Sequence, residues 1–363
     1  METPKRIFDL IEHFENDSYK TGHFFLSEKK DNEWVKYSVS DYRRCSNKLS
    51  SGFLELGIKK GDKIATVTNN RPQWNFVDIG ALQIGAVHTT VYPTISLDEF
   101  EYIFRHSESK IIFVSTEALY KKIKPLANKI DTVEHIYTFD QVEGAESWED
   151  VAELGAKNID KNIDNIHKLK SEVDENDLAT LIYTSGTTGT PKGVMLSHKN
   201  IMSNAIHSSN LVHLSLKDTA LSFLPLSHVF EHMTNYMYQY VGVSIYYAEG
   251  VSKVADNLNE LQVNGFITVP RLLEAILEKI TSKAKKLSPA KQKIFEYSLK
   301  VAEKYHPYKK MSAFYKAQHK MVDKLVFSQW RKALSENLTF IGCGGSALSP
   351  KISRIFWAAG LPI

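Results

Sequence analysis

This sequence of 363 residues has few cysteines, no long apolar run and no strong net charge. Its only two cysteines, Cys45 and Cys343, exclude a disulfide framework and a cysteine-rich zinc site, and they fit a reducing cytoplasm. No run reaches about 18 consecutive apolar residues, so we expect no membrane-spanning helix. The formal net charge of +3 implies neither nucleic-acid nor membrane affinity, and the charged, amphipathic N-terminus is not a secretory signal. The sequence therefore predicts a soluble, cytoplasmic protein.

Short apolar runs alternate with amphipathic stretches through the first third of the chain. The runs "KIATVT", "AVHTTVYP" and "KIIFVS" have the composition of buried strands, and "NRPQWNFVDIGALQIG" and "LDEFEYIFRHSE" have helical spacing. Ser96 and Glu99 have the spacing of a capping box at the start of the second helix. This alternation predicts an α/β fold, in which mostly parallel, multi-layer sheets are covered by helices.

The segment "YTSGTTGTPKG" at residues 183–193 follows the apparent strand "LATLI" and leads into another, "GVMLS". Glycines allow backbone N–H groups to converge on an anion, hydroxyls add donors, and Lys192 adds a positive charge. The composition therefore predicts a polyphosphate-binding loop. Neither G-x-x-x-x-G-K-[ST] nor G-x-G-x-x-G is present, so the loop is not of the P-loop or dinucleotide-binding type.

The extended segment "YTSGTTGTPKGVMLSHKN" resembles the phosphate-loop signature of the adenylate-forming (AMP-binding) superfamily, which includes acyl-CoA synthetases, peptide-synthetase adenylation domains and luciferases. The segments "LPLSHVFEHM" and "LTFIGCGGSALSP" resemble the parts of that family that line the acyl pocket and border the adenine. The segment "GFITVPRLLEAI", followed by a long basic insertion, is similar to the long-chain fatty acid–CoA ligases. The resemblance implies the acetyl-CoA synthetase-like large domain.

The resemblance also implies a ligase of fatty acid metabolism that uses ATP, a long-chain fatty acid and CoA, with Mg²⁺ as cofactor. A carboxylate oxygen would attack the α-phosphorus of ATP, and a thiol would then displace AMP. Lys192 and His228 are the expected catalytic residues, and Thr184 is the expected Mg²⁺ ligand. The residues expected to bind the nucleotide are Thr184, Ser185, Gly186, Thr187, Thr188, Gly189, Lys192, Gly344, Gly345, Ser346 and Ala347.

The expected fatty-acid site lies around His228, with Phe230, Glu231 and Met233 as further substrate-binding residues. His228 and Glu231 are three residues apart, so on a helix they would share a face. A core or capping pair is the alternative. The apolar stripe Phe230, Met233, Tyr236 and Met237 suits either plain core or the wall of an acyl tunnel.

The family usually has proline where this chain has Ala347, which makes the placement of the adenine-binding segment less precise. After that segment, Ser349 is predicted to cap a helix that begins at Pro350 and ends before Gly360.

The chain ends at "GLPI", before the Tyr-Gly-x-Thr-Glu segment expected from the resemblance. We therefore expect residues 1–363 to be a truncated N-terminal large domain without the C-terminal lid, and to be inactive or nearly so. Approximate subdomains are expected at 1–170 and 171–363.

A basic segment stands out between Lys279 and Lys332. This segment contains fourteen lysines and one arginine but only three acidic residues, which gives a local net charge of +12. The rest of the chain therefore has a net charge of −9. Aromatic residues are interleaved with the lysines. The segment suits a solvated helical hairpin with its aromatic side chains packed inward, or alternatively a peripheral contact with anionic lipid headgroups or phosphates.

Two other functions compete with the leading one. Another acyl-adenylating ligase could act on medium-chain, aryl or amino acids, or transfer the acyl group to a carrier protein; the Met, Tyr and Phe residues of the pocket-like segment favour an apolar acid. A non-catalytic module that binds ATP or an acyl group would need no lid.

Overall fold

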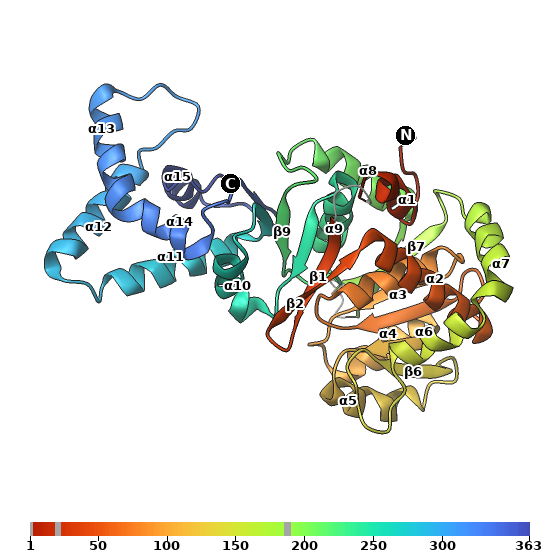
Figure 1. Ribbon diagram of the computed structural model, residues 1–363. Helices are drawn as coiled ribbons and strands as arrows, with labels where there is room; N and C mark the ends of the chain where they lie inside the picture. Colours follow the sequence, from red (N-terminus) through yellow and green to blue (C-terminus); the bar gives the residue numbers. More distant parts are fainter. Residues whose placement is uncertain (1–2, 19–22, 185–189) are drawn as a thin grey trace. The chain divides into compact units, whose positions relative to one another are not determined.

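The computed structural model describes residues 3–18, 23–184 and 190–363, which form two compact units (Figure 1). Unit 1 comprises residues 1–211 and 225–247, and unit 2 comprises residues 212–224 and 248–363. Each unit has its own parallel strands and covering helices, so the predicted α/β class is confirmed. The subdomain boundary expected near residue 170 stays a prediction.

The larger sheet of unit 1 has six strands in the order β6–β5–β3–β4–β7–β8. All neighbouring strands in it are parallel except β7 and β8, which form an antiparallel hairpin. Central parallel strands are buried on both faces and are therefore almost continuously apolar, as "KIATV" is. The strands are β3 (Lys63–Val67), β4 (Val87–Val91), β5 (Ser109–Val114), β6 (His135–Thr138), β7 (Leu178–Thr184) and β8 (Lys192–Ser197).

Helices alternate with these strands along the chain. Ser96 caps α4 (Leu97–Ser107) with the expected capping box. Its hydroxyl accepts a hydrogen bond from the Glu99 N–H (3.2 Å), and the Glu99 carboxylate accepts one from the Ser96 N–H (2.9 Å). Phe100 and Phe104 of this helix pack into the apolar core that includes Ile112. The helices are α2 (Val39–Glu55), α3 (Pro72–Leu82), α4 (Leu97–Ser107), α5 (Glu117–Ala127), α6 (Trp148–Lys157) and α7 (Ile159–Glu172).

Unit 1 contains a second group of strands, in which β1 is parallel to β10 and antiparallel to β2. Its remaining elements are α1 (Asp9–Ser18), β1 (Phe24–Lys30), β2 (Glu33–Ser38), α8 (His198–Ser209), α9 (Val229–Val241) and β10 (Ser244–Tyr247). Helix α9 carries polar side chains into the core, where Asn75, Asn235 and Tyr247 bond to one another. These buried polar groups are therefore paired, as stability requires.

Unit 2 contains three parallel strands with β11 in the middle. One turn of π-helix, η2, separates α13 from α14 within an otherwise helical stretch. The elements are β9 (Thr219–Ser222), η1 (Val251–Lys253), α10 (Val254–Leu261), β11 (Gly265–Thr268), α11 (Pro270–Ala284), α12 (Pro289–Ala302), α13 (Ala313–Val322), η2 (Asp323–Phe327), α14 (Ser328–Leu334), β12 (Phe340–Cys343) and α15 (Pro350–Ala358). Within the part of the chain that the structure describes, no helix combines the length and apolarity needed to cross a bilayer.

Candidate functional site

The Gly/Thr-rich segment lies in the sequence between strands β7 and β8, which pair with each other. Strand β7 ends at Thr184 and β8 begins at Lys192, and these two residues are opposite each other in the ladder. Strand β7 also runs parallel to β4, so Thr184 lies at the carboxyl end of a parallel strand, where ligands bind in open α/β sheets. Ser185, Gly186, Thr187, Thr188 and Gly189 lie outside the described residues, so their role in phosphate binding stays a prediction.

Thr184 and Lys192 place a hydroxyl and an ammonium group together at the base of this loop. Directly opposed residues of an antiparallel pair have their side chains on the same face, about 5 Å apart at Cβ. Both residues are exposed, so both groups can reach a ligand. A fixed cation beside a hydroxyl donor suits the oxygen atoms of a polyphosphate.

A cavity of about 350 Å³ opens beside this hairpin, and all of its lining residues belong to unit 1. Its walls come from the carboxyl ends of β4 and β7, from α4, and from the start of α9. Thr184, Pro191 and His228 share this cavity, so the structure brings the phosphate-loop segment and the expected catalytic histidine to one place.

His228 is held in place by the helix that it precedes. It is the N-cap residue of α9, and its Nδ1 accepts a hydrogen bond from the backbone N–H of Phe230 (3.1 Å). Because Nδ1 is an acceptor, the proton of the neutral ring must be on Nε2. The ring is exposed, so its Nε2–H is a donor available to an oxygen atom of a ligand in the cavity. The N-terminal end of α9 adds a positive potential.

His228 and Glu231 do not both lie inside the helix, so the condition for a shared helical face is not met, and His228 has the capping role of the alternative interpretation. His228 has extended backbone angles (φ −92°, ψ 132°) and lies before the first turn, whereas Glu231 is inside the helix and buried. Contact of Glu231 with a substrate stays a prediction.

The apolar stripe of α9 divides between core and partly exposed positions. Tyr236 and Met237 are buried in the core, and the Tyr236 hydroxyl donates to the Asp78 carboxylate. Phe230 and Met233 are only partly buried. These two side chains are therefore the part of the stripe that remains available for an acyl chain, and this role stays a prediction.

Several cavity residues were not identified from the sequence. Thr90 and Tyr92 reach it from the end of β4, and Tyr183 reaches it from β7. The Tyr183 hydroxyl forms a 2.8 Å hydrogen bond with His106 Nδ1, and burial raises the pKa of Tyr183 to about 12, so the phenol stays neutral. The available signal was the position of these residues at the ends of predicted parallel strands.

The segment expected to border the adenine belongs to unit 2. Gly344 follows β12 and its N–H donates to the Thr268 carbonyl at the end of β11 (3.1 Å). Gly345 has φ +79°, a conformation that L-residues rarely adopt. Ser346 and Ala347 are exposed after this turn, so the segment itself presents only small side chains. The segment fits contact with a planar base, and that contact stays a prediction.

The helix predicted after this segment is α15, which begins at Pro350 with Ser349 in the N-cap position. Gly360 follows the helix, as expected. The Ser349 side chain forms no capping hydrogen bond within the described residues, so the predicted position of the cap is confirmed but its hydrogen bond is not.

The hydroxyl of Thr184 is an oxygen ligand of the type that Mg²⁺ accepts. No group of three or more His, Cys, Asp or Glu residues in the described ranges could hold a metal ion by itself. Mg²⁺ usually binds few protein ligands and keeps phosphate oxygens and water molecules. Thr184 therefore fits a Mg²⁺ ion that arrives with a polyphosphate.

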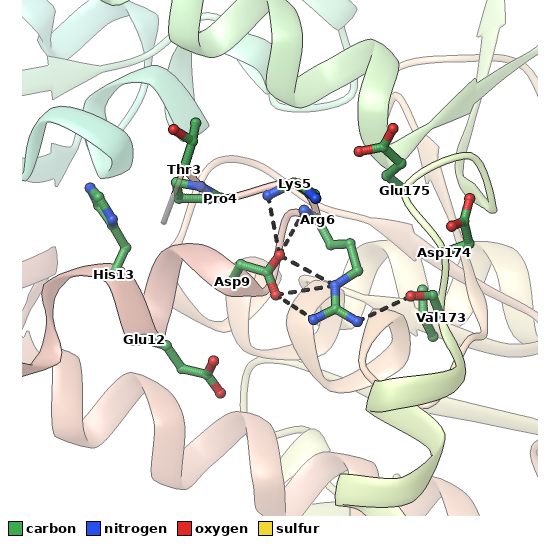
Figure 2. A pocket seen from close by; sticks show the side chains of 10 residues that line it. All are labelled: Thr3, Pro4, Lys5, Arg6, Asp9, Glu12, His13, Val173, Asp174 and Glu175. Carbon is green, nitrogen blue, oxygen red and sulfur yellow. Dashed lines mark hydrogen bonds and ion pairs between the residues drawn. The ribbon is translucent and has the colours of Figure 1, made fainter. Parts of the chain in front are cut away.

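A second cavity in unit 1, of about 690 Å³, is lined mainly by charged residues near α1 (Figure 2). Arg6 in it donates to the Asp9 carboxylate and to the carbonyl oxygens of Lys170 and Val173. Glu12 and Glu175 are paired with lysines. These charges are compensated within the protein, so the larger cavity is a weaker candidate than the one beside the hairpin.

Comparison with known sequences gives a match over nearly the whole chain. Residues 16–362 match the family model described as "AMP-binding enzyme". The peroxisomal long chain acyl-CoA synthetase 7 of Arabidopsis thaliana is 30% identical over 328 residues, covering 88% of this chain and 45% of that protein. The long-chain-fatty-acid–CoA ligase ACSBG2 of Rattus norvegicus is 29% identical over 379 residues, covering 100% of this chain and 56% of that protein. The chain thus spans about half the length of these curated relatives.

Solved structures share the fold at lower sequence identity. The N-terminal domain of FACL13 from Mycobacterium tuberculosis has a TM-score of 0.68 at 18% identity, covering 98% of this chain and 74% of that chain. The long-chain-fatty-acid-CoA ligase FadD1 from Archaeoglobus fulgidus has a TM-score of 0.68 at 19% identity, covering 99% and 62%. Both alignments match the arrangement of sheets and helices described above.

Proposed function

Because the chain belongs to the AMP-binding enzyme family, we propose that it is the nucleotide-binding large-domain portion of a long-chain fatty acid–CoA ligase. In the proposed reaction a fatty-acid carboxylate oxygen bonds to the α-phosphorus of ATP while the bond to pyrophosphate breaks. The thiol sulfur of CoA then attacks the acyl carbon and releases AMP. The printed names of the curated relatives support the choice of acid.

The observation that carries this proposal is the shared cavity of Thr184, Pro191 and His228. Lys192 would neutralise negative charge that develops on the leaving pyrophosphate, and fixed donors of this kind are a major source of catalysis. His228 would donate its Nε2–H to an oxygen of the carboxylate or of the α-phosphate. Mg²⁺ bound with ATP would supply further neutralisation of the phosphates, with Thr184 as a protein ligand.

Nucleotide binding by this chain tests the role of Lys192. Lys192→Ala should weaken ATP binding about tenfold to hundredfold, because a charge-assisted hydrogen bond contributes about 1.5–3 kcal/mol. Lys217→Ala removes an equally exposed lysine in unit 2 and is the matched control. Isothermal titration calorimetry with ATP and Mg²⁺ measures both; equal affinities for the two variants would contradict the role given to Lys192.

The nature of the acid is tested with stable alkyl esters of AMP, which resemble the acyl-adenylate and need no turnover. We expect the affinity of the ester for this chain to rise as the alkyl group is lengthened from about two to about sixteen carbon atoms, because each buried methylene contributes about 0.8 kcal/mol. A preference for short, aryl or aminoacyl groups would favour another ligase of the family. Affinity that did not depend on the alkyl group would reject the acyl site altogether.

A further inference from the structure

The geometry points to the basic segment of unit 2, residues 279–332, as a surface that binds an anionic lipid bilayer. This segment shares no residue with the expected nucleotide site, and the proposal does not depend on the proposed reaction. Its evidence is an apolar groove, a concentration of unpaired lysines around it, and an exposed apolar stripe along a neighbouring helix.

The groove lies where α11, α12 and η2 meet, within the group of helices drawn in cyan to blue (Figure 1). It has a volume of about 570 Å³, and most of its lining residues are apolar. Leu287 and Leu325 at its rim remain 44% and 52% exposed. Phe295 and Trp330 are buried and close its floor. The groove therefore offers solvent-accessible apolar surface beside two buried aromatic side chains.

Lysines surround this groove without acidic partners. Lys283 and Lys291 line it directly, and residues 279–293 contain six lysines and no acidic residue. Within the described ranges, no lysine between residues 279 and 332 forms an ion pair. Arg331, in contrast, is paired with Asp323 (2.7 Å). Clusters of about four to eight basic residues bind the negative surface of anionic membranes.

Helix α13 of the same segment also carries exposed apolar residues. Phe314 and Met321 are exposed, and they are spaced seven residues apart, so they lie on one helical face. The expectation of inward packing holds for Phe327 and Trp330, but it is wrong for Phe314, which is 74% exposed. Exposed apolar side chains together with unpaired lysines suit the interface of a bilayer, where both headgroup charge and acyl chains are present.

Charge neutralisation at the groove tests the electrostatic half of the proposal. The double substitution Lys283→Gln and Lys291→Gln should weaken binding to phosphatidylserine-containing vesicles about 25-fold at low salt, about fivefold for each lysine. Lys129→Gln with Lys217→Gln makes the same change in net charge at exposed lysines elsewhere, and should have a much smaller effect. Vesicle co-sedimentation measures the partition coefficient.

Removal of apolar side chains tests the groove itself. Leu287→Ser with Leu325→Ser keeps the charge and should weaken vesicle binding about tenfold, because two exposed leucine side chains can no longer enter the bilayer. Leu211→Ser with Val251→Ser changes exposed apolar residues elsewhere and is the control. All four residues are exposed, so thermal unfolding should be unchanged and should confirm that each variant is folded.

Each outcome decides the proposal. Loss of binding in both groove variants but in neither control supports it. It is overturned if the unsubstituted chain does not bind anionic vesicles at low salt, or if it binds pure phosphatidylcholine equally well. It is also overturned if the leucine variant keeps full binding, or if analytical ultracentrifugation shows that the leucines hold a dimer together instead.

Discussion

His228 makes one hydrogen bond to its own helix and has a second nitrogen available for a ligand. The backbone N–H of Phe230 uses Nδ1, and Nε2 remains free to donate. Asparagine can form the same capping bond but lacks the imidazole ring. The two functions of His228 can therefore be separated by substitution.

We predict that His228→Asn changes the free energy of unfolding by less than about 0.5 kcal/mol, whereas His228→Ala lowers it by about 1 kcal/mol through loss of the cap. Both variants should bind the long alkyl ester of AMP about tenfold more weakly, since both lack the Nε2 donor. Urea unfolding and calorimetry measure the two effects. Full ligand affinity in the asparagine variant would show that His228 acts only as a cap.

A buried chain of hydrogen bonds joins α3, β4 and α9 in unit 1. His88 Nδ1 lies 2.7 Å from Asp78 Oδ1, and His88 Nε2 lies 2.8 Å from the Thr66 hydroxyl. The Tyr236 hydroxyl donates to the other oxygen of Asp78. One carboxylate thus satisfies two buried groups.

Asp78→Ala should lower the free energy of unfolding by about 3–5 kcal/mol, because it leaves both partners buried without their acceptor. Asp164→Ala removes an exposed carboxylate from α7 and should have an effect below about 0.5 kcal/mol. Chemical denaturation measures both. A loss below about 1 kcal/mol for the Asp78 variant would mean that water replaces the carboxylate.

At the scale of elements, helices α2 and α6 approach so closely that a side chain would not fit between them. A Cβ atom added at Gly155 would lie 1.7 Å from the Lys48 carbonyl oxygen, and one at Gly52 would lie 2.3 Å from the Val151 carbonyl oxygen. These obstructing atoms belong to the backbone, so rotation of a side chain cannot make room.

Gly155→Ala should therefore lower the free energy of unfolding by about 1–3 kcal/mol or more, although alanine ordinarily stabilises a helix relative to glycine by about 1 kcal/mol. Glu153→Ala changes the exposed face of the same helix and should stay within about 0.5 kcal/mol. Thermal and urea unfolding distinguish the two. A stabilised Gly155 variant would contradict the close packing of α2 on α6.

Elements with local signals could be predicted, and those that depend on distant contacts could not. Ser96 and Glu99 predicted the start of α4, because both partners of the capping box lie within one helical turn. The cap of α9 had no comparable signal, because histidine is not among the residues strongly preferred at the N-cap, yet His228 caps this helix. The π-turn η2 had no signal in the sequence.

At the scale of the whole molecule, two buried histidines make stability depend on pH. Burial lowers the pKa of His198 and of His232 to about 4, from an ordinary value of 6.5. The unfolded chain therefore takes up protons on these rings below about pH 6.5, while the folded chain does so only near pH 4. Their contribution to stability is complete above pH 6.5 and is lost as the pH falls towards 4.

We predict that each histidine lowers the free energy of unfolding by about 2 kcal/mol between about pH 7 and about pH 5. His232→Phe keeps an aromatic ring against Trp74 and removes one titrating group, so urea unfolding should show a smaller loss over the same range. A variant with the same pH dependence as the unsubstituted chain would exclude His232 as a source of acid sensitivity.

In the candidate site, too, some residues could be predicted from their own sequence segments, whereas others depend on contacts between distant segments. Thr184, Lys192 and His228 could be predicted because their segments resemble those of a known family. Thr90 and Tyr92 could not, because they reach the cavity only through the pairing of β4 with β7, which the order of the strands in the sequence does not reveal.

The pairing of Thr184 with Lys192 also bears on how the loop between them can evolve. Bringing the ends of a loop together has an entropic cost that grows only slowly with its length. Here the antiparallel ladder already holds the two ends in place, from Leu178 and Ser197 at one end to Thr184 and Lys192 at the other. The hydroxyl and the ammonium group are thus positioned independently of the residues between them. If these two groups bind phosphate as proposed, insertions or replacements between them should alter which phosphate-bearing ligand is preferred while leaving both groups at the ends of their strands.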